Sequence, residues 1–136
     1  MTDKPVVLFL GVHNAGRSLA ARVQLDHYAK GRVRVESAGS EPGHLLNPSV
    51  VEVLRERGLD PSREFPKPLT DQAARMADVI VTVGCGDTCP VYPGKRYLNW
   101  ELEDPAGRSV EQVRPVVDEI DQRVHELLAE LIPDLD

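Results

Sequence analysis

The sequence predicts an α/β domain in three layers, with a four-stranded parallel sheet flanked by helices. Two observations carry this prediction. Apolar, β-branched runs at Val6–Leu10 and Val79–Val83 each stop at a glycine, and continuous apolar runs of this length are typical of strands buried on both faces. Segments with apolar residues at helical spacing alternate with the expected strands, and that alternation produces a parallel sheet with helices on both faces.

Each element follows from a local pattern. Strands are expected where apolar or β-branched residues run together or alternate, and helices where a capping residue precedes apolar residues at helical spacing. In chain order, the expected elements are a strand at 6–10, a helix at 18–28, a strand at 32–36, a helix at 48–57, a short helix at 71–76, strands at 79–83 and 96–99, and a final helix after residue 109.

Polar residues mark where the helices begin. Ser18 can cap the first helix, Asn47 is a cap followed by proline, and Thr70 can cap the short helix. Ser109 has a glutamine three residues later and forms a capping box. Pro115 lies early in the last helix, so we expect a kink, an irregular first turn or a later start there.

Composition limits the class of protein. The chain has 136 residues, 41% hydrophobic and 28% charged, which fits a single globular domain over residues 1–136. A net charge of −6 argues against a general nucleic-acid-binding function. No apolar run approaches the length of a membrane span and no signal-peptide pattern is present, so we expect a cytoplasmic protein with no membrane partner. We also expect a monomer.

The stretch from Val6 to Ser18, VVLFLGVHNAGRS, organises the expected site. An order of strand, tight loop and helix start points several backbone N–H groups at one place, where the helix dipole adds positive potential. Arg17 adds a planar fork of donors that can hold two oxygens of a phosphate-like group. The alternative is a glycine-containing loop that opens an α/β domain without a catalytic role.

This loop resembles the anion-binding loop of the low-molecular-weight protein tyrosine phosphatases and of the arsenate reductases built on the same fold. Their signature is a cysteine, five residues, an arginine, and a serine or threonine. The resemblance implies that the oxyanion contacts Val12, His13, Asn14, Ala15, Gly16, Arg17 and Ser18. The chain departs from the signature at Gly11, where the family has its nucleophilic cysteine.

Gly11 has no side chain, so we expect the chain to bind an oxyanion without carrying out the first chemical step. The glycine is either a deliberate substitution or the mark of a naturally inactive relative. The resemblance further implies that Asp104, in the string Asp-Pro-Ala-Gly, is the general acid. The alternative is a solvated carboxylate in an acidic loop. Asn14 and Ser37 match residues that brace the anion loop.

Cys85 and Cys89 follow the strand expected at 79–83. Thioredoxin-coupled arsenate reductases have two further thiols after this strand. The resemblance implies that Cys85 attacks the thiol–arsenate adduct and releases arsenite, and that Cys89 attacks the resulting disulfide and presents it to thioredoxin. Thioredoxin would be the external reductant, with no bound cofactor; a small-thiol reductant is the alternative. No second cysteine pair accompanies these two, so we expect no metal.

These observations favour an arsenate reductase of the phosphatase-like, thioredoxin-coupled type that lacks its nucleophile. A low-molecular-weight phosphatase, also disabled, is the second interpretation, but nothing in the sequence resembles the aromatic walls that hold a phosphotyrosine ring. A non-enzymatic oxyanion-binding or redox-sensing domain is the third.

Overall fold

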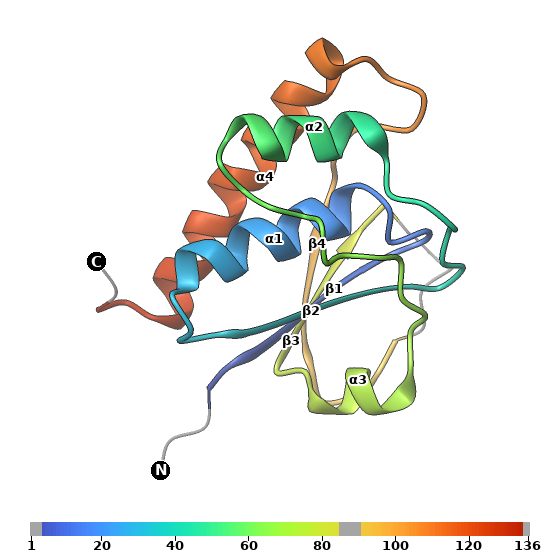
Figure 1. Ribbon diagram of the computed structural model, residues 1–136. Coiled ribbons are helices and arrows are strands. Elements are labelled where there is room, and N and C mark those ends of the chain that lie inside the picture. The colour runs from blue at the N-terminus through green and yellow to red at the C-terminus, as the bar shows by residue number, and fades with distance from the viewer. Residues whose placement is uncertain (1–3, 85–90, 135–136) are drawn as a thin grey trace.

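The computed structural model describes residues 4–84 and 91–134 (Figure 1). Its centre is a single parallel sheet in the strand order β2-β1-β3-β4. The strands are β1 (Val6–Gly11), β2 (Arg34–Gly39), β3 (Val79–Val83) and β4 (Arg96–Trp100). The predicted four-stranded parallel sheet is therefore confirmed, and the short strand β4 lies at its edge.

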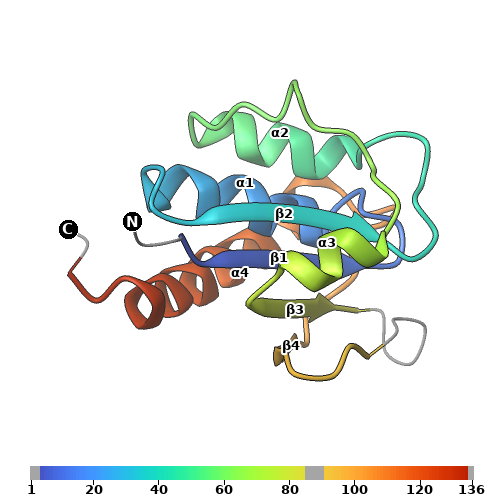
Figure 2. The same ribbon diagram turned by 90° about the horizontal axis from the view of Figure 1, so that it is seen from below.

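Four helices complete the three layers. They are α1 (Arg17–Ala29), α2 (Pro48–Glu56), α3 (Asp71–Met76) and α4 (Val110–Leu131). Helices α1 and α4 pack together on one side of the sheet, and α2 packs on α4. Figures 1 and 2 show α3 on the other side, beside β1 and β3. Within the described residues, no helix combines the length and the apolar character needed to cross a membrane.

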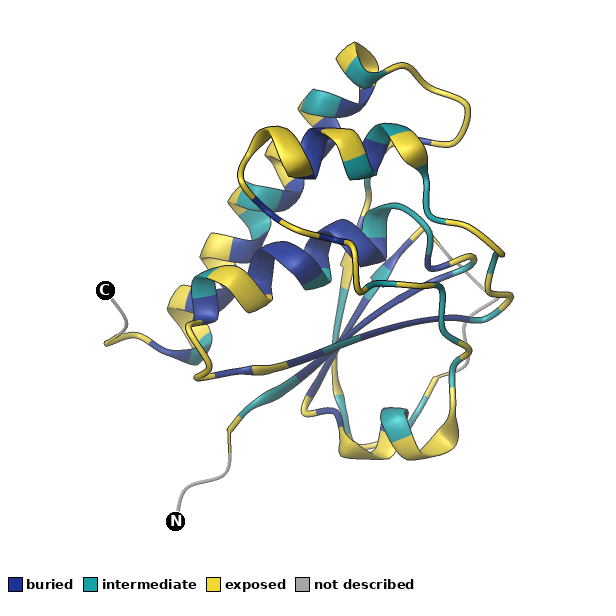
Figure 3. Ribbon diagram, in the orientation of Figure 1, coloured by how far each residue is buried: buried dark blue, intermediate teal, exposed yellow. Residues whose placement is uncertain are grey.

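The sheet separates two apolar clusters, which explains the continuous apolar runs of the central strands. Phe9 and Val81 face the larger cluster, together with residues of α1, α2 and α4. Leu8 and Ile80 face the smaller cluster on the α3 side. Both sides of β1 and β3 are therefore buried (Figure 3). Burial of a large apolar side chain contributes about 1.5–3 kcal/mol.

The second strand differs from the prediction. We expected the sequence Ser37-Ala38-Gly39 to end the strand, but β2 runs through Gly39, and these three residues pair with Phe9, Leu10 and Gly11 of β1. The cause is tertiary: β1 offers a full-length partner, so the backbone groups of all three residues are satisfied in the sheet. The side chains of Ser37 and Ala38 are small and buried.

The start of the first helix also differs. Ser18 does not cap α1, which begins at Arg17 after Gly16 without a side-chain cap. The Ser18 hydroxyl instead accepts a hydrogen bond from Asn14 Nδ2 at 2.9 Å, inside the first turn. The other caps are confirmed at Asn47, Thr70 and Ser109. Helix α4 starts directly after Ser109 and includes Pro115 in its second turn, so the later start is not observed.

A polar cluster joins α1 to α4. The Tyr28 hydroxyl donates to Asp121 Oδ1 at 2.6 Å, and the Tyr28 ring lies 4.1 Å from the His125 ring, centroid to centroid. The hydrogen bond to Asp121, reinforced by burial, raises the pKa of Tyr28 from 10.0 to about 12. Because the folded state holds this proton more tightly than the unfolded state, the contribution to stability is complete below pH 10 and is lost as the pH rises towards 12.

Replacing this tyrosine should change the alkaline stability. Tyr28→Phe removes the hydroxyl and should cost about 1 kcal/mol of unfolding free energy at pH 8. Between pH 10 and pH 12 the unchanged chain should lose more unfolding free energy than Tyr28→Phe, because only the unchanged chain carries the shifted phenol. Urea unfolding at several pH values measures both quantities. Equal losses in the two proteins over this pH range would contradict the assignment.

Candidate active site

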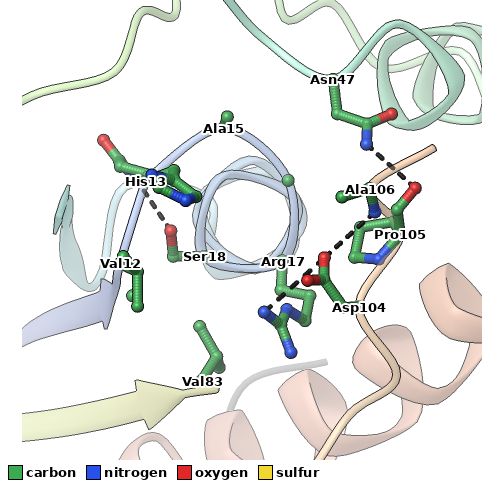
Figure 4. A pocket seen from close by; sticks show the side chains of 13 residues that line it. Val12, His13, Ala15, Arg17, Ser18, Asn47, Val83, Asp104, Pro105 and Ala106 are labelled. Atoms are coloured by element: carbon green, nitrogen blue, oxygen red, sulfur yellow. Dashed lines mark hydrogen bonds and ion pairs between the residues drawn. The ribbon is translucent and has the colours of Figure 1, made fainter. Parts of the chain in front are cut away.

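The carboxyl ends of the four parallel strands meet at one edge of the sheet, as such folds require. Gly11 at the end of β1 lies beside Gly39 of β2, and Val83 of β3 pairs with Trp100 of β4. A cavity of about 80 Å³ opens at this edge (Figure 4). The described residues that line it are Gly11, Val12, His13, Asn14, Ala15, Gly16, Arg17, Ser18, Asn47, Val83, Asp104, Pro105 and Ala106.

The structure thus brings together the whole predicted loop and Asp104. Ser37 is not in the cavity wall: it is buried in β2, and its hydroxyl has no hydrogen-bond partner among the described residues. Its support of the loop stays a prediction. Cys85 and Cys89 lie outside the described residues, so their part in the site also stays a prediction.

Backbone hydrogen bonds from the segment 40–47 fix the orientation of the loop. Four N–H groups of this segment donate to four carbonyls of the loop: Ser40 to Gly11 (3.0 Å), Glu41 to Val12 (2.8 Å), Gly43 to His13 (2.9 Å) and Asn47 to Ala15 (2.7 Å). Among the described residues, the N–H groups of residues 12–16 donate to no protein acceptor. Within the described part of the chain, the carbonyls are therefore paired and the N–H groups are not, which is the polarity that an anion site needs.

Asn14 holds the turn of the loop from inside. Its backbone has a φ of 53°, in the left-handed region that asparagine tolerates better than most residues. The side chain is buried, with Nδ2 donating to Ser18 Oγ and Oδ1 accepting from the Lys67 N–H at 2.9 Å. One side chain therefore ties the loop both to α1 and to the segment that follows α2, which fits the predicted bracing.

Gly39 permits the close approach between β2 and the loop. A Cβ atom at this position would lie 2.5 Å from the Val12 carbonyl oxygen and 3.1 Å from the Asn14 nitrogen, which real Cβ atoms do not tolerate. Gly39 was not among the predicted site residues. Its signal in the sequence is the Ser-Ala-Gly string, which resembles the family and has an ordinary turn as the alternative.

The Arg17 guanidinium has three neighbours. Its Nη1 donates to the Leu102 carbonyl at 3.0 Å, and its Nη2 lies 3.8 Å from Asp104 Oδ1. Gly84, at a φ of 75°, places its backbone against the guanidinium so closely that a Cβ there would overlap it. The Arg17 side chain is only 17% exposed. The guanidinium is therefore held in place rather than free in solvent, and local sequence does not predict its contact with Gly84.

Asp104 stands at the rim of the cavity. Its side chain is 66% exposed, and its Oδ1 accepts from the Ala106 N–H at 3.0 Å. The adjacent Pro105 packs against Gly16, where an added Cβ would lie 3.0 Å from the proline ring. The carboxylate thus lies next to the loop and within reach of Arg17 (Figure 4). This position suits a group that exchanges a proton with a ligand in the cavity.

Gly11 is not required by the backbone. Its φ is outside the positive range that favours glycine. A Cβ there would lie 3.4 Å from Ser18 Oγ and from the Val83 carbonyl oxygen, which is ordinary contact. The position can therefore accept a side chain at the floor of the loop.

Comparisons with known proteins agree with this geometry. The profile of the low molecular weight phosphotyrosine protein phosphatase family matches residues 6–135. A putative arsenate reductase of Halobacterium salinarum is 33% identical over 131 residues, covering 93% of this chain and 92% of that protein. The crystal structure of an arsenate reductase from Archaeoglobus fulgidus is 35% identical with a TM-score of 0.76, covering 90% of this chain and 98% of that one.

A third similar protein is the thioredoxin-dependent arsenate reductase of Corynebacterium glutamicum, 48% identical with a TM-score of 0.81. The alignment covers 96% of this chain, which spans 62% of the length of the Corynebacterium chain. Fold, loop and sequence therefore lead to one conclusion: the chain belongs to the low molecular weight phosphotyrosine protein phosphatase family.

Proposed function

We propose that this protein belongs to the arsenate-reducing branch of its family, in which arsenate is converted to arsenite with electrons from thioredoxin. Gly11 would leave the present chain able to bind the oxyanion without turnover. The observation that carries the proposal is the loop itself, whose carbonyls are tied to the segment 40–47 and whose N–H groups are available at a small cavity. The names of the similar proteins support the reduction of arsenate as the reaction.

The described walls of the cavity favour an inorganic oxyanion over an aryl phosphate ester. Besides the loop, the described lining residues are Asn47, Val83, Asp104, Pro105 and Ala106. None of the described lining residues is phenylalanine, tyrosine or tryptophan. A phosphotyrosine ring would need an apolar slot to bury its faces. The phosphatase alternative therefore has less support, and a non-enzymatic oxyanion-binding domain remains the alternative for the chain as it stands.

The residues divide the proposed chemistry between them. The loop N–H groups, the α1 N-terminus and the Arg17 fork would hold the arsenate oxygens. Asp104 would protonate the oxygen that leaves arsenic when a thiolate attacks from the position of Gly11. Cys85 would then attack that sulfur. The new S–S bond forms as the S–As bond breaks. The electron pair of the S–As bond stays on arsenic, so arsenic(V) is reduced to the arsenic(III) of arsenite.

Cys89 and thioredoxin would complete the cycle. Attack by Cys89 moves the disulfide to the Cys85–Cys89 pair, which thioredoxin reduces. A protein that depends on thiol–disulfide exchange of this kind suits a reducing compartment, so the cytoplasmic location stays our prediction. The monomeric state also stays a prediction.

Gly39→Ala should weaken oxyanion binding in the unchanged Gly11 background. The added methyl group collides with the Val12 carbonyl, so the loop must shift and its N–H groups lose alignment. Loss of one charge-assisted hydrogen bond is worth about 1.5–3 kcal/mol, and we expect arsenate affinity to fall about tenfold or more by calorimetric titration.

Gly43→Ala is the matched control for Gly39→Ala. It lies in the same segment, keeps its N–H bond to His13, and has room for a Cβ, with the nearest atom at 3.7 Å. Its arsenate affinity should stay within about twofold of the parent. If both variants bind arsenate as the parent does, the loop is not the oxyanion site.

Gly11→Cys should create arsenate reductase activity. A Cβ at this position meets only ordinary contacts, and the introduced thiol would lie amid the loop N–H groups and near Arg17, which favour its ionised form. We expect arsenate-dependent NADPH consumption with thioredoxin and thioredoxin reductase. Turnover should be lost again when Cys85→Ser or Cys89→Ser is added, and should fall about 100-fold or more with Asp104→Asn.

The same variant separates the alternatives. Hydrolysis of an aryl phosphate that does not depend on Cys85 or Cys89 would identify a phosphatase instead. Absence of both activities in a folded Gly11→Cys protein that still binds arsenate would favour the oxyanion-binding domain.

A further inference from the structure

We propose that Asn47 is a positioning residue. Its side-chain amide holds the acid loop, residues 104–108, against the anion loop, so that the Asp104 carboxylate lies next to the bound oxyanion. The inference rests on the proposed function in taking Asp104 as the acid. The sequence predicts only a helix cap at Asn47, and nothing about a cap requires it to lie in the wall of the cavity, where the structure places it.

Asn47 contacts three separate segments at once. Its Oδ1 accepts from the N–H groups of Ser49 (3.0 Å) and Val50 (3.1 Å), which caps α2. Its Nδ2 donates to the Pro105 carbonyl at 3.1 Å, as Figure 4 shows. Its backbone N–H donates to the Ala15 carbonyl of the anion loop at 2.7 Å. One residue therefore links a helix start, the acid loop and the anion loop.

The geometry gives each half of the side-chain amide a different task. The acceptor oxygen is used by the helix, and the donor nitrogen is used by the acid loop. Serine and aspartate cap helices about as well as asparagine does, but neither carries an N–H₂ group that can reach the Pro105 carbonyl. The cap alone would be met equally by any of the three residues, whereas the combined task needs asparagine.

Helix α2 supports this bond, because its buried residues Val50, Val53 and Leu54 belong to the same apolar cluster as residues of α4. The acid loop is also held by the Arg108 N–H, which donates to the Pro105 carbonyl at 3.1 Å, and by Arg17, whose Nη2 lies 3.8 Å from Asp104 Oδ1. A second tie comes from the start of α2, where Ser49 Oγ donates to the Arg108 carbonyl at 2.8 Å. The N-terminus of α2 thus holds the loop on both sides of Ala106.

The consequence for Asp104 follows from the chain. Asp104 directly precedes the residue that Asn47 holds, and its carboxylate accepts from the Ala106 N–H. Losing the bond to Pro105 should let the carboxylate move relative to the cavity. The tie to Ala15 is a backbone bond, so it survives any non-proline substitution at Asn47. Acid placement and oxyanion binding can therefore be separated by experiment.

The first test uses the Gly11 chain as it exists. In Asn47→Ser, amide hydrogen exchange at Ala106, followed by NMR, should become at least several-fold faster, while arsenate affinity by calorimetry should fall less than in Gly39→Ala, because the backbone bond to Ala15 remains. Asn47→Asp keeps the cap and lacks the donor, so it is the second variant if Asn47→Ser does not fold. Thr70→Ala, which removes the α3 cap away from the site, controls for stability and should leave Ala106 exchange unchanged.

The second test uses Gly11→Cys and turnover with thioredoxin. Adding Asn47→Ser should lower kcat about tenfold and change KM for arsenate much less, since a displaced acid affects chemistry more than binding. In the Gly11→Cys, Asp104→Asn background, Asn47→Ser should lower kcat no further, because the effects of two residues that act through one group are not additive. Thr70→Ala should lower kcat in neither background.

Two results would overturn the proposal. One is unchanged Ala106 exchange in folded Asn47→Ser or Asn47→Asp; the other is an equal loss of kcat with and without Asp104. A Gly11→Cys protein without turnover would count against the proposed function instead, and the exchange measurement would still decide whether Asn47 holds the acid loop.

Discussion

The row of hydrogen bonds between the segment 40–47 and the anion loop is the constraint on which the site depends. A short loop between a strand and a helix has more carbonyls and N–H groups than it can pair internally, and either set could face the cavity. Here four carbonyls are used by N–H groups of one neighbouring segment, and among the described residues the loop N–H groups have no protein acceptor. Gly39 makes this possible, because any side chain there would push the two backbones apart.

The remaining supports come from different parts of the chain and meet at the same edge of the sheet. Gly84 follows β3 and packs on the Arg17 guanidinium, and Leu102 follows β4 and accepts from it. Asn47 precedes α2 and reaches the acid loop. Parallel strands place all of their carboxyl ends together, so segments far apart in sequence can hold one arginine and one carboxylate. The arrangement is preorganised: Arg17 is mostly buried and already paired before an oxyanion arrives.

Under the proposed function, Gly11 would separate binding from chemistry in this chain. A Cβ at this position would lie in ordinary contact with Ser18 and Val83. None of the hydrogen bonds that orient the loop passes through a side chain at position 11. The binding machinery can therefore persist without the nucleophile. Removing a thiolate also removes a negative charge from beneath the anion, which favours oxyanion binding.

The sequence by itself determined the fold class, the two central strands, three of the four helix caps and the residues of the anion loop. These depend on local patterns. A strand that is buried on both faces must be apolar throughout, and the side chain of a capping residue must accept a hydrogen bond from a backbone N–H of the first helical turn. Only the tertiary structure decided that Ser37 to Gly39 continue β2, because their pairing partner β1 is remote in sequence. The tertiary contacts of Gly39, Gly84 and Asn47 could not be predicted for the same reason. Each depends on which backbone lies within a few ångströms, and local sequence does not encode that proximity.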